Sequence, residues 1–134
     1  MKELEYPFDA AYIIKKRKSL KKALLADGTS RIRKKIAVFG GSTTSDIVKT
    51  LELFLLDAGI EPEFYESEYA QYFQDAMFPD ETLLSFKPDI VFIHTTNRNV
   101  TDWPEMTDTT EQIDEKLHTE INRFTAMWKS IAEK

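Results

Sequence analysis

The chain has 134 residues, no cysteine and a net charge of −5, with 42% hydrophobic and 31% charged residues. This balance is typical of one globular domain, and it excludes a disordered chain, disulfides and thiolate chemistry. Because no stretch approaches the roughly 18 apolar residues of a membrane helix and the N-terminus lacks the apolar core of a signal peptide, we expect a soluble, cytoplasmic protein with no membrane partner.

The first expected element is a basic helix over residues 8–26. Apolar residues recur there at helical spacing with Lys and Arg between them, and Asp27-Gly28 ends the segment. Residues 1–35 carry a net charge of +7, whereas residues 36–134 carry −12. Such a segment can bind nucleic acid or phosphate, but no aromatic residues are interleaved with its cations. We favour a solvated helix face and expect no nucleic-acid partner.

Short apolar runs and helical patterns alternate in the rest of the chain. Ile36–Phe39 and Ile90–Ile93 are typical of strands that are covered on both faces, and Glu63–Glu66 is a weaker strand. A helix is expected over residues 44–58, and one or two helical turns are expected within residues 69–78. A further short helix is expected from the N-cap Asp80 to Phe86.

This alternation predicts a three-layer α/β/α domain around a parallel sheet. The strand order 2-1-3 of SGNH and flavodoxin-like folds is the expected one. Residues 35–134 would form this domain, and residues 1–34 would form an N-terminal basic helix and linker.

The last segment predicts a long amphipathic helix that begins near Asp108. Asp108 and Glu111 have the spacing of a capping box. Only three strands are recognisable, where sheets commonly have about five. We therefore expect an incomplete domain from a larger multidomain protein, with part of the helix's apolar stripe uncovered; a domain that completes its sheet by dimerisation is the alternative. The stripe consists of Ile113, Leu117, Ile121, Phe124, Trp128 and Ile131.

Two polar loops follow the two apolar strands, Gly40–Thr44 after the first and His94–Asn99 after the third. With strand order 2-1-3 they are neighbours at the edge of the sheet where ligands bind in such folds. Backbone N–H groups at the start of the following helix favour an anion or an oxyanion. The motif is neither a Rossmann fingerprint nor a P-loop. The alternative is a tight turn in which Ser42 or Thr43 is only an N-cap.

The third-strand run resembles a block of the SGNH (GDSL-type) hydrolases. Lys-Pro-Asp-Ile-Val-Phe-Ile at 87–93 ends in Thr95-Thr96-Asn97-Arg98, and Gly-Gly-Ser at 40–42 stands where that family has Gly-Asp-Ser. The resemblance implies Ser42 as nucleophile and Asn97 as oxyanion donor. This sequence departs from the family pattern at Gly41 and Arg98, which stand where the family has Asp. Neither His94 nor His118 lies in a motif that would make it the general base. The residues expected to bind ligand are Gly40, Gly41, Thr43, Thr44, Thr96 and Arg98.

Nearly the whole chain resembles the N-terminal SGNH-like domain of FkbH-like proteins of the haloacid-dehalogenase (HAD) superfamily, subfamily IIIC. The blocks are Lys-Ile-Ala-Val-Phe-Gly-Gly-Ser-Thr-Thr (35–44) and the segments 51–56, 59–66 and 68–72. These bacterial proteins work in polyketide, capsular polysaccharide and other glycan biosynthesis. The resemblance implies a downstream HAD domain as partner, with an acyl carrier protein or a glycan-linked substrate. Mg²⁺ would belong to that absent domain, and no cofactor or metal is expected in this part.

Three functions are compatible with these residues. The first is a ligand-binding or positioning domain of a HAD-type hydrolase, with little activity alone. The second is an SGNH serine esterase or acetyl-hydrolase domain whose base lies downstream. The third is a structural docking or oligomerisation module.

Overall fold

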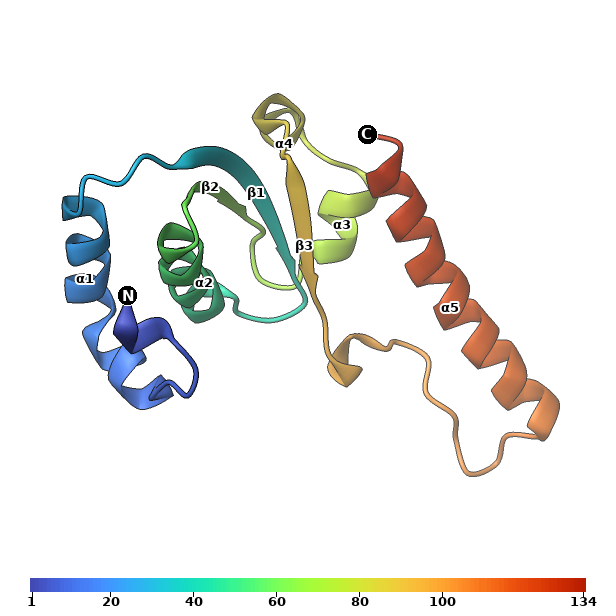
Figure 1. The fold of residues 1–134 in the computed structure, drawn as a ribbon. Helices are drawn as coiled ribbons and strands as arrows, with labels where there is room; N and C mark the ends of the chain where they lie inside the picture. The colour runs from blue at the N-terminus through green and yellow to red at the C-terminus, as the bar shows by residue number, and fades with distance from the viewer.

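Three parallel strands form the centre of the molecule in the order β2-β1-β3. The computed structural model describes all 134 residues, and Figure 1 shows helices on both sides of this sheet. The expected α/β fold and strand order are thereby confirmed. The strands are β1 (Ile32–Gly40), β2 (Ile60–Glu66) and β3 (Ile90–His94).

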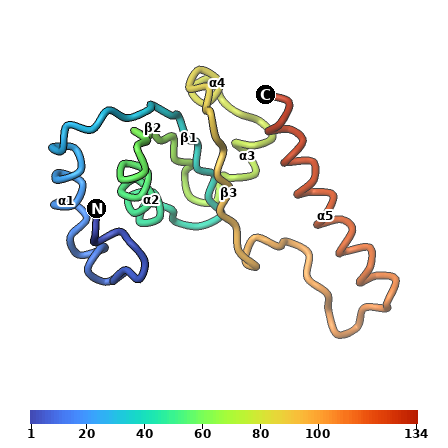
Figure 2. Tube along the Cα trace, in the orientation of Figure 1, coloured from blue at the N-terminus to red at the C-terminus, as the bar shows by residue number.

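The helices form two groups around the sheet. Figure 1 shows α1 and α2 on one side of it and α3 and α5 on the other, and the trace in Figure 2 shows the chain passing from the first side to the second after β2. The α-helices are α1 (Ala10–Ala26), α2 (Ser45–Asp57), α3 (Tyr72–Met77), α4 (Glu81–Phe86) and α5 (Thr110–Ala132); the short 3₁₀ turns are η1 (Lys2–Leu4) and η2 (Asn97–Asn99).

The core consists of two apolar clusters, one of which includes alternate residues of β1. Every residue from Ile36 to Gly40 is buried, as expected for a central strand. Ala37 and Phe39 pack with α3 and with Met127 of α5. The second cluster joins α1 to α2, with η1 contributing, and each leucine buried there stabilises the fold by about 1.5–3 kcal/mol. Its members are Leu4, Ile13, Leu20, Leu24, Leu53 and Leu56.

The strands are longer than the apolar runs that predict them. β1 begins at Ile32, so its first residues lie in the segment that the sequence assigns to the linker. Backbone pairing with β2, from Ile32↔Ile60 onward, extends the strand through the charged residues Arg33 to Lys35. Periodicity does not detect this part, because its side chains bury little apolar surface.

The start of α5 differs from the predicted capping box by one residue. Thr109 is the N-cap, and its box partner is Gln112 rather than Glu111. Asp108 accepts hydrogen bonds from the backbone N–H of Glu105 (2.7 Å) and from Lys116 Nζ (2.7 Å), so it closes the preceding turn. The other predicted N-cap, Asp80, is confirmed, because its carboxylate accepts from the Leu83 N–H at 2.9 Å.

An apolar face of the molecule is uncovered beside β3. On the side of α2, Ile90 and Phe92 are 49% and 38% exposed. The edge strand β2 carries Pro62 and three glutamates, which protect an edge strand from pairing, whereas β3 contains no Asp, Glu, Lys or Arg. Four residues of the predicted apolar stripe of α5 are also exposed, as the sequence predicts: Ile113, Leu117, Ile121 and Trp128.

Replacing Phe92 by lysine is expected to reduce self-association while changing the free energy of unfolding by less than about 1 kcal/mol, because the ring is partly in solvent and a charge blocks edge pairing. Light scattering at increasing concentration and urea denaturation measure the two effects. Leu84→Lys on α4 is the matched control, since Leu84 is also half-exposed but belongs to a helix and not to a strand. Unfolding of the Phe92→Lys protein would show that this face is covered.

Candidate functional site

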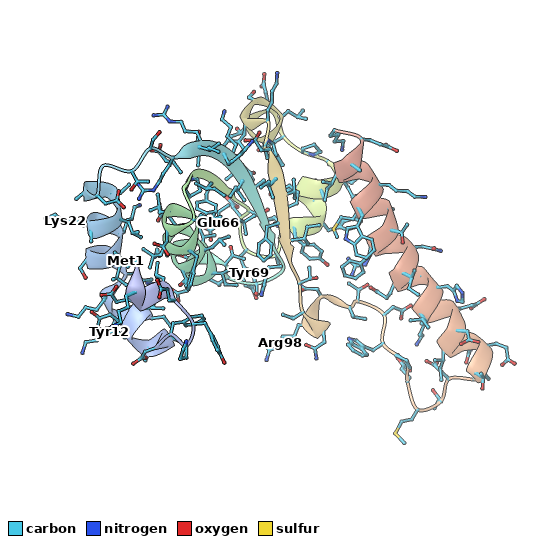
Figure 3. The ribbon with its side chains drawn as sticks, in the orientation of Figure 1. Met1, Tyr12, Lys22, Glu66, Tyr69 and Arg98 are labelled. Carbon is cyan, nitrogen blue, oxygen red and sulfur yellow. The ribbon has the colours of Figure 1, made fainter.

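The carboxyl ends of the three strands bring three polar loops to one edge of the sheet, here called the carboxyl edge. Gly40–Thr44 follows β1, residues 67–71 follow β2, and Thr95–Asn99 follows β3. Figure 3 shows Tyr69 and Arg98 at this edge, where both side chains are exposed. The neighbouring positions expected for the first and third loops are therefore confirmed.

The first loop is tight, and its glycine at the strand end is required by close contact. A Cβ atom on Gly40 would lie 2.8 Å from the carbonyl oxygen of Ser42 and 2.5 Å from Cγ2 of Thr44. Thr44 is buried, and its hydroxyl donates to Glu66 Oε1 at 2.8 Å, which ties this loop to the end of β2. The Thr44 hydroxyl is thus occupied within the protein, and no side chain caps the first N–H groups of α2.

Asn99 connects the first and third loops. Its Nδ2 donates to the carbonyl oxygen of Gly41 at 3.0 Å, and its Oδ1 accepts from the backbone N–H of Thr96 at 2.8 Å. The carboxamide occupies the space beside Gly41, because a Cβ atom there would lie 2.3 Å from Nδ2 and Oδ1 of Asn99. Gly41 and Asn99 therefore fit together only while residue 41 has no side chain.

Arg123 of α5 holds Asn99 in the position from which it contacts Gly41. Its Nη2 donates to the carbonyl oxygen of Asn99 at 2.6 Å, and its Nη1 donates to the Tyr72 hydroxyl at 2.9 Å. The guanidinium also lies 4.7 Å from the ring centre of Phe124. A continuous set of contacts thus runs from α5 through Asn99 to the Gly41 loop.

Glu120 anchors the segment after η2 to α5. The buried carboxylate accepts from the backbone N–H of Thr101 (3.0 Å), the Thr101 hydroxyl (2.5 Å) and the Asp102 N–H (3.1 Å), and it pairs with Arg123 at 2.9 Å. Burial alone would raise the pKa of Glu120, but the hydrogen bonds from Thr101 and Arg123 outweigh it and lower the pKa to about 2. The carboxylate is therefore ionised at neutral pH.

The side chains of the predicted site residues differ in their exposure to solvent. Thr43, Asn97 and Arg98 are exposed, Ser42 is partly buried, and none of the four side chains makes a hydrogen bond or an ion pair within the protein. The Thr96 hydroxyl accepts from the Arg98 N–H at 3.3 Å and so caps η2. Asn99 rather than Asn97 contacts the first loop.

Neither histidine makes a hydrogen bond with the Ser42 hydroxyl. The backbone oxygen of His94 accepts from the Gly41 N–H at 2.9 Å, while its buried Nδ1 has no partner. His118 is exposed on α5, with its Nδ1 2.7 Å from the carbonyl oxygen of Asp114.

The chain contains no group of three or more His, Cys, Asp or Glu residues that could hold a metal ion. None of its helices combines the length and apolarity that crossing a bilayer requires.

Comparisons with known proteins give one informative likeness. Neither a family model nor a curated protein matches the chain. Among solved structures, the chain is similar to the N-terminal part of the protein BF1531 from Bacteroides fragilis, described as containing a phosphatase domain and complexed with Mg. The TM-score is 0.64 at 19% sequence identity, which is a likeness of fold. The match covers 83% of this chain but only 29% of that structure.

Proposed function

We propose that this chain is the N-terminal ligand-binding and positioning module of a larger hydrolase with a phosphatase-type HAD domain. The observation that carries the proposal is the joining of the first and third loops by the Asn99–Gly41 contact at the carboxyl edge. The similar fold in a protein with a phosphatase domain supports it, as do the uncovered faces of β3 and α5, which are suited to a further domain. Mg²⁺ would be held by that domain.

The ligand proposed for the carboxyl edge carries an anionic group. Ser42, Thr43, Asn97 and Arg98 offer unused donors, and the uncapped start of α2 adds backbone N–H groups at the positive end of the helix dipole. In the protein family that the sequence resembles, such a group would arrive on an acyl carrier protein or on a glycan-linked substrate of polysaccharide or polyketide biosynthesis.

The esterase alternative requires a general base within hydrogen-bonding reach of Ser42. No histidine or carboxylate of this chain makes a hydrogen bond with its hydroxyl. Asn99, the asparagine that contacts the first loop, donates to the Gly41 carbonyl, and the predicted oxyanion donor Asn97 is exposed and makes no hydrogen bond with that loop. These contacts favour binding over hydrolysis.

Titration with inorganic phosphate and with acetate, followed by amide NMR, tests the proposal. The signals of residues 42–45 are expected to shift, and Arg98→Gln is expected to weaken phosphate binding at least about fivefold through loss of a charge-assisted hydrogen bond. Arg33→Gln is the matched control, because Arg33 is exposed at the opposite end of the sheet. Equal weakening in both variants, or no shift in residues 42–45, would contradict the site.

The same proteins can be assayed for turnover of p-nitrophenyl acetate. Positioning without catalysis predicts no difference in rate between the unmodified protein and Ser42→Ala. Turnover that depends on Ser42, in this chain or in one that includes the downstream domain, would establish the esterase instead.

A further inference from the structure

One helix, α1, carries a third of the basic residues of the protein. The segment of α1 contains six Lys and Arg residues and no acidic residue, whereas the whole chain has a net charge of −5. Everything outside α1 therefore carries −11. A basic helix on an otherwise acidic protein sets up a local field that attracts acidic surfaces.

Only two of the six cations are used within the fold. Arg17 pairs with Asp46 at 2.8 Å and Lys21 with Glu52 at 2.7 Å, and both contacts fasten α1 to α2. The other four, Lys15, Lys16, Lys18 and Lys22, have no ion pair. Three of them lie on one side of the helix and form what we call the basic face: Lys15, Lys18 and Lys22. Figure 3 shows Lys22 on the side of α1 that faces away from α2.

Exposed apolar side chains lie among these lysines. Ile14 and Leu25 are 55% and 51% exposed. At 100° per residue they share a sector of about 100° with Lys15, Lys18 and Lys22, and they lie about 16 Å apart along the axis. Beside them, an open groove of about 570 Å³ lies between α1 and α2, and its lining includes Ile14, Lys15, Lys18 and Lys49.

We infer that the basic face, with Ile14 and Leu25, is a docking surface for an acidic amphipathic helix of a partner protein. Carboxylates on such a helix would complement the lysines, and its apolar stripe would contact the two exposed side chains. The groove is open to solvent and Glu52 also lines it, so it does not enclose a small anion, which needs convergent donors in a concave site. This inference does not depend on the ligand proposed for the carboxyl edge.

Two other kinds of partner fit less well. A helix that lies on a membrane inserts its main apolar face, but in α1 that face, with Ile13, Leu20 and Leu24, is already buried against α2. A nucleic acid would be repelled by the −11 charge outside α1, and no aromatic residue lines the groove to stack with bases.

The probe for this surface is a synthetic, end-capped helical peptide with a leucine stripe flanked by glutamates, and binding is measured by fluorescence anisotropy. The triple change Lys15→Gln, Lys18→Gln, Lys22→Gln is expected to weaken binding at least about tenfold at low salt, and Ile14→Ser about threefold. Arg17 and Lys21 are left in place because they hold α1 on the fold.

Two matched controls distinguish the effect of losing the docking surface from the effect of a general change in net charge or in exposed apolar area. Lys2→Gln, Lys87→Gln, Lys129→Gln removes the same charge from lysines without ion pairs elsewhere, and Leu84→Ser removes an equally exposed apolar side chain. Neither control is expected to change the peptide affinity by more than about twofold. Equal loss in the two triple variants would overturn the inference. Tighter binding of phosphatidylserine vesicles or of poly(U) RNA through the same three lysines would also overturn it.

Discussion

Gly41→Ala is expected to lower the free energy of unfolding by about 2–4 kcal/mol, as measured by urea denaturation. The new methyl group would occupy the position of the Asn99 carboxamide, 2.3 Å from its Nδ2 and Oδ1 atoms. Overpacking of this kind costs about 1–3 kcal/mol, and displacing Asn99 also breaks its bonds to Gly41 and Thr96, each worth about 1 kcal/mol.

A second substitution at Asn99 tests this cause directly. Asn99→Ala alone loses the two hydrogen bonds, but in the Gly41→Ala background it also removes the clash. The double variant is therefore expected to be more stable than the sum of the single effects predicts, by at least about 1 kcal/mol. Gly40→Ala is the matched control, because a Cβ atom there meets Ser42 and Thr44 rather than Asn99, so Asn99→Ala should not rescue it. Additive effects at Gly41 would contradict the pairing.

This pairing bears on the resemblance to the SGNH hydrolases. In that family an aspartate precedes the serine, whereas here Gly41 precedes Ser42 and the Asn99 side chain fills the adjoining space. The loop is thus held from the third strand rather than by a side chain of its own. This arrangement fixes the backbone beside Ser42 without supplying a catalytic group.

The sequence predicts the parts of this fold that depend on apolar burial. The run Ile36–Phe39 becomes the buried half of the central strand, and Ile90–Ile93 becomes most of β3. Because the carboxyl ends of parallel strands lie at one edge, the convergence of their loops follows from the same patterns. The charged first half of β1 is not predicted, since its pairing depends on the backbone and not on side-chain burial.

The candidate site is predicted less completely, because the direction of a polar side chain depends on local turns. Asn97 and Asn99 lie in the same loop, and composition does not distinguish them. The η2 turn places Asn97 in solvent and directs Asn99 to Gly41. The one signal in the sequence is the glycine at position 41, which leaves space that another side chain can fill. Arg123 is also missed, because a cation on an amphipathic helix is expected on the solvated face.

Arg123→Met is expected to lower the free energy of unfolding at pH 7 by about 3–4 kcal/mol. The change leaves the Glu120 carboxylate buried without its cation, and breaking a buried pair from one side costs about 3–5 kcal/mol. It also removes the donors to Asn99 and Tyr72, so faster amide hydrogen exchange is expected at Gly41 and Ser42. Arg98→Met is the control, because it removes the same charge from an exposed side chain without partners.

Acid titration of the same two variants tests the role of Glu120. Its pKa is lowered from 4.5 to about 2, so the stability that it contributes is fully present above about pH 4.5 and is lost as the pH falls towards 2. Without Arg123 the carboxylate binds a proton more readily, and the stability gap between the unmodified protein and Arg123→Met should therefore narrow over this range. Arg98→Met should show no such narrowing. A gap that is constant from pH 7 to pH 2 would mean that Arg123 acts through packing on Phe124 and not through its charge, and the set of contacts from α5 to the Gly41 loop would lose its electrostatic basis.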